Sequence, residues 1–388
     1  MKYNFDRVID RRITDSIKWG DRERNFDRDV IPMWIADMDF ESPAPVIEAI
    51  TARARQGVYG YPMPTPTYYG ALIEWMEKRH GWTLEREWLS HSPGVVPALN
   101  YAVQAYTQPG DKIIVQPPVY FPFFSAVTNN GRHLVFNPLK FEDGTYRMDL
   151  EDLEKKMDPR AKLLILCSPH NPVGRVWSAQ ELAQLGEVCL RNNLIILSDE
   201  IHGDLILSGH KHTSLAMLSD ALAQNTLTCI APSKTFNLAG LFTSVAIIPN
   251  PRLRVQVNAA RDNAGVASAN IFGIAGLDAA YRAGEEWLDQ VLDYLQGNLN
   301  FLMDYFHACI PEIKPIRPEG TYLVWLDCRG LGMTDAALKE WMLKKVKVTM
   351  NEGAQFGIGG EGFMRMNIGC PRALLVEALQ RIERAVRG

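Results

Sequence analysis

The chain has 388 residues, of which 47% are hydrophobic and 22% are charged, and its formal net charge is −4. This length is sufficient for two domains, and the composition is that of a globular protein. The small negative charge argues against a nucleic-acid-binding protein, because such proteins carry clustered positive charge. No apolar run reaches the ~18 residues that would span a membrane. The start of the sequence, Met1 to Asp6, lacks the apolar core of an export signal, so we expect no export.

The cysteines are widely separated and include no Cys-x-x-Cys pair. They are Cys167, Cys189, Cys229, Cys309, Cys328 and Cys370. In a chain of this length, such dispersed cysteines favour a reducing, cytoplasmic location and argue against a disulfide framework or a zinc site. We therefore expect a cytoplasmic protein with no metal.

Three helices are predicted in the first third of the chain. The first follows Ser42-Pro43 and runs to about Gln56, the second covers Tyr68 to His80, and the third begins near Gly94. A fourth helix begins at Ser178, where Ser178 and Glu181 have the spacing of a capping box.

Predicted strands alternate with helical segments between about residues 43 and 285. They are Lys112–Val115, Lys162–Cys167, Leu194–Ser198, Thr226–Ile230 and Val245–Ile248. Alternation of this kind predicts an α/β fold in which a mostly parallel sheet is covered by helices on both faces.

The pattern changes after residue 285. A long helix is predicted from Glu285 to His307, followed by strands at Thr321–Leu326 and Phe363–Asn367. This pattern predicts a smaller α+β domain. We expect a large domain over residues 46–286 and a small domain formed by residues 1–45 together with 287–388.

Lys234 is the residue with the most unusual placement. It lies in the segment 231–240, APSKTFNLAG, just after the predicted strand Thr226–Ile230. An amine at the end of a buried strand is partly desolvated, and such lysines form Schiff bases with carbonyl compounds. Lys234 alone is compatible with any Schiff-base enzyme; if it forms a Schiff base with a bound cofactor, the protein carries pyridoxal phosphate (PLP).

Two other predicted strands also end in polar residues. Asn171 follows the strand that ends at Cys167, and Asp199 follows the strand that ends at Ser198. Asn-Pro is a common turn and an acid after a strand is often a helix cap, so neither residue alone identifies a site. The carboxyl ends of parallel strands meet at one edge of a sheet, where ligands bind. Asn171, Asp199 and Lys234 should therefore converge on one cofactor.

The chemistry of PLP suggests a role for each of these side chains. Lys234 would hold the cofactor covalently and later remove the α-proton of the substrate. Asp199 would pair with the pyridine nitrogen, because an opposite charge keeps that nitrogen protonated. Asn171 would donate a hydrogen bond to the phenolate oxygen of the ring.

The phosphate and the ring face need further groups. The backbone N–H groups of Val95 and Val96, in a helix that starts after Gly94, are suited to bind the phosphate. Ser233 would add a hydroxyl group. Tyr120 is a candidate to stack on the ring; the alternative is an aromatic side chain that is simply buried in a proline-rich turn.

Several motifs along the whole chain support a resemblance to one family. They are residues 32–40 (PMWIADMDF), 57–62 (GVYGYP), 168–177 (SPHNPVGRVW), 198–202 (SDEIH), 233–237 (SKTFN) and 365–372 (RMNIGCPR). The chain resembles the fold-type-I PLP enzymes of the aminotransferase class I/II superfamily. Within that superfamily it is most similar to the MalY/PatB-type carbon–sulfur lyases, also called cystathionine β-lyases.

The resemblance implies additional site residues. Arg365 would hold the α-carboxylate of the substrate through a bidentate pair, with Arg372 as the weaker candidate. Ala36 would contribute a backbone N–H to the same carboxylate. The family builds its active sites from two chains, so a homodimer is implied. Tyr61, or alternatively Tyr59, would reach the cofactor phosphate of the neighbouring subunit.

Two positions depart from the pattern of many aminotransferases. Phe242 stands where they carry a phosphate-binding Arg, and His202 stands where they commonly carry a Tyr near the phenolate oxygen. Both departures match the MalY/PatB type, and they favour a lyase.

The function implied is α,β-elimination of an S-substituted L-cysteine such as L-cystathionine, which gives a thiol (homocysteine), pyruvate and ammonia. Two alternatives remain at this point. One is an aminotransferase that uses the same cofactor and lysine, and the other is a regulatory protein that retains the PLP site and binds a protein partner.

The segment Gly357–Gly362 satisfies G-x-G-x-x-G but precedes a predicted strand, so we expect a loop there and no dinucleotide site.

Overall fold

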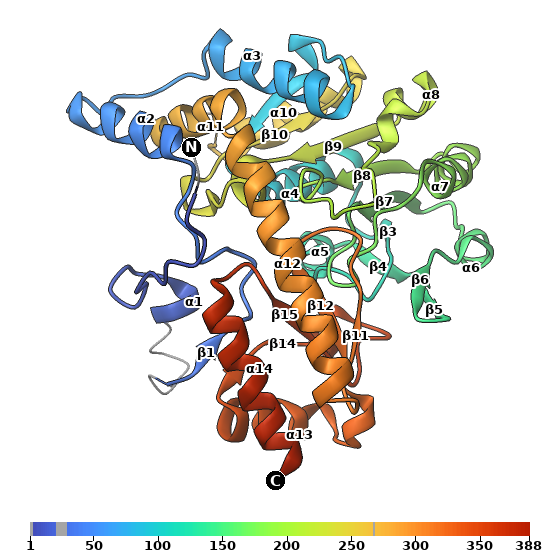
Figure 1. Ribbon diagram of the computed structural model, residues 1–388. Helices are drawn as coiled ribbons and strands as arrows, with labels where there is room; N and C mark the ends of the chain where they lie inside the picture. Colours follow the sequence, from blue (N-terminus) through green and yellow to red (C-terminus); the bar gives the residue numbers. More distant parts are fainter. Residues whose placement is uncertain (1–2, 21–28, 267) are drawn as a thin grey trace.

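Two β-sheets organise the chain in the computed structural model, which describes residues 3–20, 29–266 and 268–388 (Figure 1). The larger sheet has seven strands, and a second sheet of four strands lies below it in this view. Residues 1–2 and 21–28, which belong to the predicted small domain, and residue 267 fall outside the description.

The seven-stranded sheet has the order β2-β10-β9-β8-β7-β3-β4. Its strands are β2 (Leu89–Ser92), β3 (Lys112–Val115), β4 (His133–Phe136), β7 (Ala161–Cys167), β8 (Ile195–Asp199), β9 (Thr226–Ile230) and β10 (Ser244–Ile247). Strand β10 is antiparallel to both of its neighbours. The adjacent strands in the rest of the sheet, in the order β9-β8-β7-β3-β4, all pair in parallel. The predicted α/β fold with a mostly parallel sheet is confirmed.

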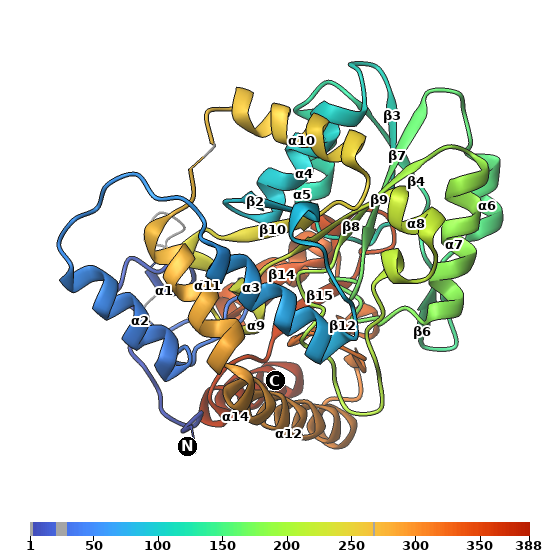
Figure 2. The same ribbon diagram turned by 90° about the horizontal axis from the view of Figure 1, so that it is seen from above.

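Alternate side chains of the central strands point to opposite faces of this sheet and are buried on both. On one face, Ile113 and Leu163 belong to a core cluster with residues of α4 (Val95–Tyr106) and α10 (Pro251–Asn263), two helices that lie side by side in Figure 2. Helix α5 (Pro122–Thr128) covers the same face. On the other face, residues such as Ile114 pack against α6 (Leu150–Lys155) and α7 (Ala179–Arg191). Burial of each such side chain contributes about 1.5–3 kcal/mol.

The predicted helix over Tyr68–His80 has a different form in the structure. Helix α3 begins at Pro66 and ends at Trp75, and the chain continues as a π-helix, η1, from Met76 to His80. The Thr65 hydroxyl caps α3 by accepting from the Tyr68 N–H at 3.3 Å. Helix α11 (Ile271–Ala283) packs against both α3 and α2 (Ala44–Arg55).

The four-stranded sheet is antiparallel throughout and has the order β11-β12-β15-β14. Its strands are β11 (Lys314–Ile316), β12 (Leu323–Asp327), β14 (Asn351–Glu352) and β15 (Phe363–Asn367). The long helix α12 (Glu285–Cys309) runs beside this sheet and packs against α14 (Arg372–Arg387) (Figure 1). The Gly357–Gly362 segment is a loop that leads into β15, as predicted.

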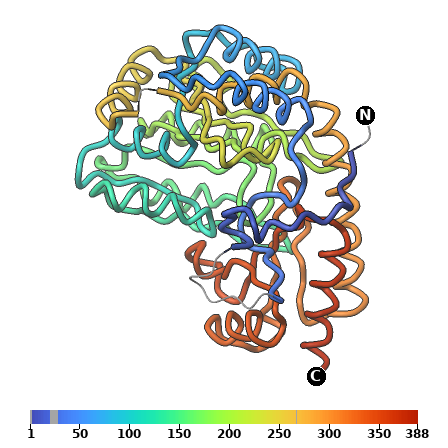
Figure 3. The backbone as a smooth tube through the Cα atoms, turned by 90° about the vertical axis from the view of Figure 1, so that its left-hand side faces the viewer, coloured from blue at the N-terminus to red at the C-terminus, as the bar shows by residue number. Residues whose placement is uncertain are grey.

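The N-terminal segment lies against the C-terminal part of the chain (Figure 3). Strand β1 (Ile31–Pro32) pairs in parallel with β13 (Val348–Thr349), and α1 (Ile17–Gly20) precedes it. The smaller remaining elements are the β5–β6 hairpin (Lys140–Glu142 and Thr145–Arg147), α8 (Asp220–Gln224), α9 (Pro232–Thr235) and α13 (Asp335–Glu340).

Within the described residues, the longest and most apolar helices still fall short of what a membrane-spanning segment requires. All six cysteines are free thiols, and five of them are buried.

Candidate active site

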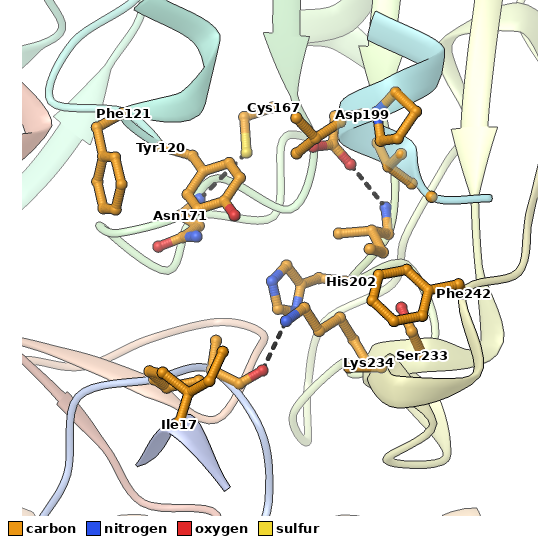
Figure 4. A pocket seen from close by; sticks show the side chains of 18 of the residues that line it. Ile17, Tyr120, Phe121, Cys167, Asn171, Asp199, His202, Ser233, Lys234 and Phe242 are labelled. Atoms are coloured by element: carbon orange, nitrogen blue, oxygen red, sulfur yellow. Dashed lines mark hydrogen bonds between the residues drawn. The ribbon is translucent and has the colours of Figure 1, made fainter. Parts of the chain in front are cut away.

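Three neighbouring strands deliver the predicted residues to one cavity of about 530 Å³ (Figure 4). Strands β7, β8 and β9 run parallel, and Asp199 lies opposite Cys167 on one side and Cys229 on the other. Their carboxyl ends therefore share one edge of the sheet. Asn171, Asp199 and Lys234 all line the cavity there.

Most of the other predicted site residues line the same cavity. They are Ala36, Gly94, Val95, Val96, Tyr120, His202, Ser233 and Arg365. The cavity also includes residues that sequence reasoning did not assign to the site, which are Ile17, Trp34, Ile35, Phe121, Cys167, Ile201, Thr243 and Asn351.

The Lys234 side chain extends from the short helix α9 into the cavity. Its Nζ donates a hydrogen bond to the Ala36 carbonyl oxygen at 2.6 Å. Burial lowers the pKa of Lys234 to about 8, and the nearby Asp37 carboxylate opposes this shift. A lysine with this pKa has a far larger neutral fraction near pH 8 than an ordinary lysine, and the neutral amine is the form that attacks a carbonyl group or accepts a proton.

The Asp199 carboxyl is buried at the end of β8, with 4% of the residue exposed. Burial raises the pKa of Asp199 to about 7, although the hydrogen bond from the Ile201 N–H at 3.1 Å opposes this effect. A buried carboxyl with one backbone donor still has oxygen lone pairs to share. A cationic ring N–H that bonded there would stabilise the ionised form.

Helix α4 presents its N-terminus to the cavity. Gly94 is its N-cap and no side chain caps the helix. The N–H groups of the first turn have no partner within the helix and carry its positive dipole, so this end is suited to bind an anion. Ser233 and Thr243 add hydroxyl groups to the cavity wall.

The functional groups of PLP each have a counterpart among the residues of this cavity. The Lys234 amine could bind the aldehyde carbon, and the Asp199 carboxyl, which accepts one backbone hydrogen bond, could bind the ring nitrogen. The helix N-terminus at Val95 could bind the phosphate. The residues present fit the predicted cofactor.

Arg365 provides a buried positive charge on β15, with 3% of the residue exposed. Its guanidinium donates to the Asn171 Oδ1 at 2.8 Å, to the Asn351 Oδ1 at 2.6 Å and to the Trp34 carbonyl oxygen at 2.9 Å. Its Nε has no hydrogen-bond partner. Burial lowers the pKa of Arg365 to about 10, and no carboxylate of the described residues is among the groups that influence it. An unpaired buried cation favours binding of an anion.

Two aromatic residues complete the wall near Asn171. Burial and the Asp199 charge raise the pKa of Tyr120, so its hydroxyl stays protonated. Burial lowers the pKa of His202 well below its usual value, and its ring lies edge-on to Tyr322 with centroids 6.1 Å apart. Figure 4 shows both side chains directed toward the space around Lys234.

The segment around Ala36 is fixed by a buried group of charges. Arg11 bonds to Asp37 at 2.8 Å and to Asp39 at 2.6 Å. Lys18, whose side chain is only 1% exposed, bonds to Asp39 at 2.8 Å. The Ala36 carbonyl oxygen, which accepts from Lys234, also accepts from the Tyr322 hydroxyl at 2.9 Å. The role predicted for Ala36 concerns its backbone N–H, which has no hydrogen-bond partner among the described residues.

Three of the candidates lie outside this cavity, and two of them, Tyr61 and Tyr59, were predicted to reach the site of the neighbouring subunit. Tyr61 is 100% exposed, and Tyr59 is exposed and donates its hydroxyl to the Ala54 carbonyl at 2.7 Å. Arg372 begins α14 and bonds to the Asn298 side chain at 2.7 Å, so Arg365 is the guanidinium that faces the cavity.

Phe242 lines the mouth of the cavity and is 63% exposed.

The described residues contain no group of three His, Cys, Asp or Glu side chains that could hold a metal ion.

Residues 28–382 match the family described as aminotransferase class I and II. The chain is 46% identical to cystathionine beta-lyase PatB of Bacillus subtilis (strain 168), in an alignment that covers 99% of this chain and 100% of PatB. It is 30% identical to the protein MalY of Escherichia coli (strain K12), with 99% of both chains covered. In structure it is similar to the PLP-bound C-S lyase from Staphylococcus hominis, with a TM-score of 0.93, 34% identity, and coverage of 100% of this chain and 99% of the lyase.

These matches extend over nearly the whole length of the chain, as do the motifs noted in its sequence. The chain therefore belongs to the aminotransferase class I and II family and, within it, to the MalY/PatB type.

Proposed function

We propose that the protein is a PLP-dependent carbon–sulfur β-lyase. It cleaves an S-substituted L-cysteine such as L-cystathionine and gives a thiol (homocysteine for cystathionine), pyruvate and ammonia. The observation that carries this proposal is the pair of buried cations, Lys234 and Arg365, that face one cavity beside the Asp199 carboxyl. An α-amino acid would place its amine toward Lys234 and its carboxylate at Arg365.

When PLP is bound, it withdraws electrons from the α-carbon of the substrate and makes the α-proton acidic. Lys234 is the base that accepts this proton at its Nζ, because burial keeps the pKa of this amine near 8. Arg365 holds the substrate carboxylate, with the guanidinium itself fixed by Asn171 and Asn351. Asp199 would pair with the ring nitrogen of the bound cofactor and favour its protonated form. We assign no residue to the departing thiolate.

Incubation with L-cystathionine in the absence of a keto acid distinguishes this function from an aminotransferase. We expect thiol, pyruvate and ammonia to form in equal amounts over many turnovers. Strict dependence of substrate loss on an added keto acid would reject the lyase. Phe242, at the position where many aminotransferases carry a phosphate-binding Arg, favours the lyase outcome.

Asp199→Asn should change stability and activity in opposite directions. In the cofactor-free protein, burial raises the pKa of Asp199 to about 7, so the native state holds a proton that the unfolded state has released between about pH 4 and 7. The contribution of Asp199 to stability is therefore lost as pH rises through this window. At pH 8 the cofactor-free variant should be more stable than wild type by on the order of 2–4 kcal/mol, and the difference should vanish near pH 4.

The same variant should lose about 10²–10³-fold in kcat, since an amide cannot stabilise a cationic ring nitrogen. Thermal melting at several pH values and steady-state kinetics measure the two effects. A variant with unchanged melting at pH 8 and unchanged kcat would show that Asp199 does not hold the ring.

We further propose that the protein is a homodimer in which Tyr61 contacts the cofactor phosphate of the partner subunit. Four apolar side chains between α2 and α3 are unusually exposed, namely Val58, Tyr59, Tyr61 and Met63. Exposed apolar stretches of this kind mark interaction surfaces. If sites are shared, mixing inactive Lys234→Ala chains with weakened Tyr61→Ala chains should form hybrids with one complete site and recover activity. No recovery in verified hybrids would reject a shared site.

The domain division and location are proposed on separate grounds. The seven-stranded sheet lies wholly within residues 46–286, and the four-stranded sheet and the β1–β13 pair lie outside that range, so we propose the predicted division into two domains.

The six free thiols support a cytoplasmic location, which fractionation of cells would test. The regulatory alternative, a protein that retains the PLP site and binds a protein partner, stays a prediction, which a pull-down from cell extract would test.

A further inference from the structure

A second cluster of polar side chains lies directly behind the candidate active site. Asp199 and His202 line the large cavity, whereas Glu200 and Asp204, in the same loop, line a separate cavity of about 10 Å³. A void of this size holds about one water molecule. The groups around it are therefore closely packed and have little room to rearrange.

Asp204 accepts three hydrogen bonds in this cluster. The Trp75 Nε1 donates at 3.0 Å, His80 Nε2 bonds at 2.7 Å, and the Thr235 hydroxyl donates at 2.8 Å. These bonds lower the pKa of Asp204 against the effect of its burial, so the carboxylate is charged. Trp75 lies at the end of α3 and His80 at the end of η1, so their bonds attach Asp204 to these two helices.

Glu200, four residues before Asp204 in the same loop, is also held by several hydrogen bonds. It accepts from the Ser198 hydroxyl at 2.8 Å and from the Ser214 hydroxyl at 3.1 Å, and it bonds to His212 Nε2 at 2.9 Å. The rings of His80 and His212 meet edge to face, with centroids 5.8 Å apart. Glu200 directly follows Asp199, and Thr235 directly follows Lys234. Each cofactor-facing residue thus has a neighbour in sequence that is fixed by this cluster.

The contact to Thr235 matters because α9 is too short to hold Lys234 by itself. Helix α9 has four residues, and the cap at Phe236 contributes a single backbone hydrogen bond, to Pro232. Thr235 is fully buried, so its hydroxyl bond to a charged carboxylate is shielded from water. A rotation of this turn would move the Lys234 Nζ, which lies 2.6 Å from the Ala36 oxygen on the far side of the cavity.

We propose that Asp204, held by His80 and Trp75, is a positioning residue for Lys234 and acts through the Thr235 hydroxyl. The proposal rests on the proposed function only in naming Lys234 as the reactive amine. An alternative is that the cluster stabilises the fold without affecting the reach of Lys234. The two differ in whether loss of the Thr235 hydroxyl slows the chemistry of Lys234 itself.

Thr235→Val removes the hydroxyl and keeps the shape of the side chain. The cofactor-free protein is mixed with PLP, and covalent capture at Lys234 is followed by absorbance and by mass spectrometry after borohydride reduction. We expect capture to slow about ten- to a hundredfold, and kcat to fall by a similar factor with KM nearly unchanged. Thr235→Ser keeps the hydroxyl, so both its capture rate and its kcat should be close to those of the wild type. Asp204→Asn should act in the same direction, and the double variant should be no slower than the slower single variant.

Thr228→Val is the matched control. Thr228 is fully buried on β9, the strand that leads into α9, and its hydroxyl has no hydrogen-bond partner. The same substitution there should leave the capture rate unchanged. A second control introduces Thr235→Val into the Lys234→Ala chain, where noncovalent PLP affinity should not change, because the only residue positioned by Thr235 is already absent.

Normal capture by Thr235→Val together with a lowered melting temperature would overturn the proposal and assign the cluster a structural role. Equal loss of PLP affinity in the Lys234→Ala background would also overturn it. Failure of the wild-type protein to cleave cystathionine would instead reject the proposed function and leave the capture comparison intact, since capture needs only PLP and Lys234.

Discussion

Lys234→Ala should abolish both turnover and covalent attachment of the cofactor. The Lys234 amine is the group in the cavity that combines burial, a pKa lowered to about 8 and a position facing Asp199 and Arg365. Removal of a nucleophile that also acts as the base should lower kcat by about 10⁴-fold or more. Mass spectrometry after borohydride reduction should find PLP on Lys234 in the wild type and on no residue in the variant.

Lys18→Met is a useful comparison for this experiment. Lys18 is also a buried lysine, but it bonds to Asp39 at 2.8 Å and does not line the cavity. Its replacement should lower stability, because Asp39 loses a buried partner, but should leave cofactor attachment at Lys234 in the folded protein. Retention of covalent PLP by Lys234→Ala would contradict the assignment of the reactive amine.

Arg365→Ala should weaken substrate binding far more than it weakens cofactor binding. The guanidinium is buried and no acid of the described residues neutralises it, so a substrate carboxylate there would form a desolvated, charge-assisted pair. Loss of such a pair costs about 2–5 kcal/mol, which corresponds to a fall of about 30- to 5000-fold in kcat/KM. The KM for L-cystathionine should carry most of this change. PLP affinity, measured by titration of the cofactor-free protein, should change little.

Arg365→Lys and Arg372→Ala sharpen this prediction. Lysine keeps the charge but cannot form a bidentate pair, so it should recover only part of the lost affinity. Arg372 bonds to Asn298 outside the cavity, and its loss should affect the melting temperature and leave KM near the wild-type value. A wild-type KM in Arg365→Ala would mean that the carboxylate is held elsewhere.

The strands that were predictable from sequence are short, largely apolar segments bounded by turn residues. The structure has β3, β9 and β15 at the predicted bounds, because buried strands between turns leave a clear pattern. Strand β2 was not predicted, since three of its four residues, Ser90 to Ser92, are polar even though all are buried. The antiparallel direction of β10 was also not predictable, because direction depends on the path of the connection between strands.

The site residues that could be predicted from sequence alone are polar residues that come just after predicted strands. Asn171, Asp199 and Lys234 were found in this way, whereas Asn351 and Tyr322 were missed because neither lies in a recognisable motif. The bond between Arg365 and Asn171 joins residues 194 positions apart, and only the folded chain reveals it. Asp37 lies in the motif at residues 32–40, but its charge near Lys234 depends on how that segment crosses the cavity.

The most direct test of the account is the isotopic content of the product formed from L-cystathionine in D₂O without a keto acid. Elimination removes the α-proton and the thiolate, and the released enamine takes up one solvent hydrogen at its methyl carbon as it becomes pyruvate. Immediate reduction to lactate by lactate dehydrogenase and NADH prevents further exchange. We predict one deuterium at the methyl carbon and one thiol for each lactate formed. Intact thioether recovered as a keto acid, with no thiol released, would contradict the account.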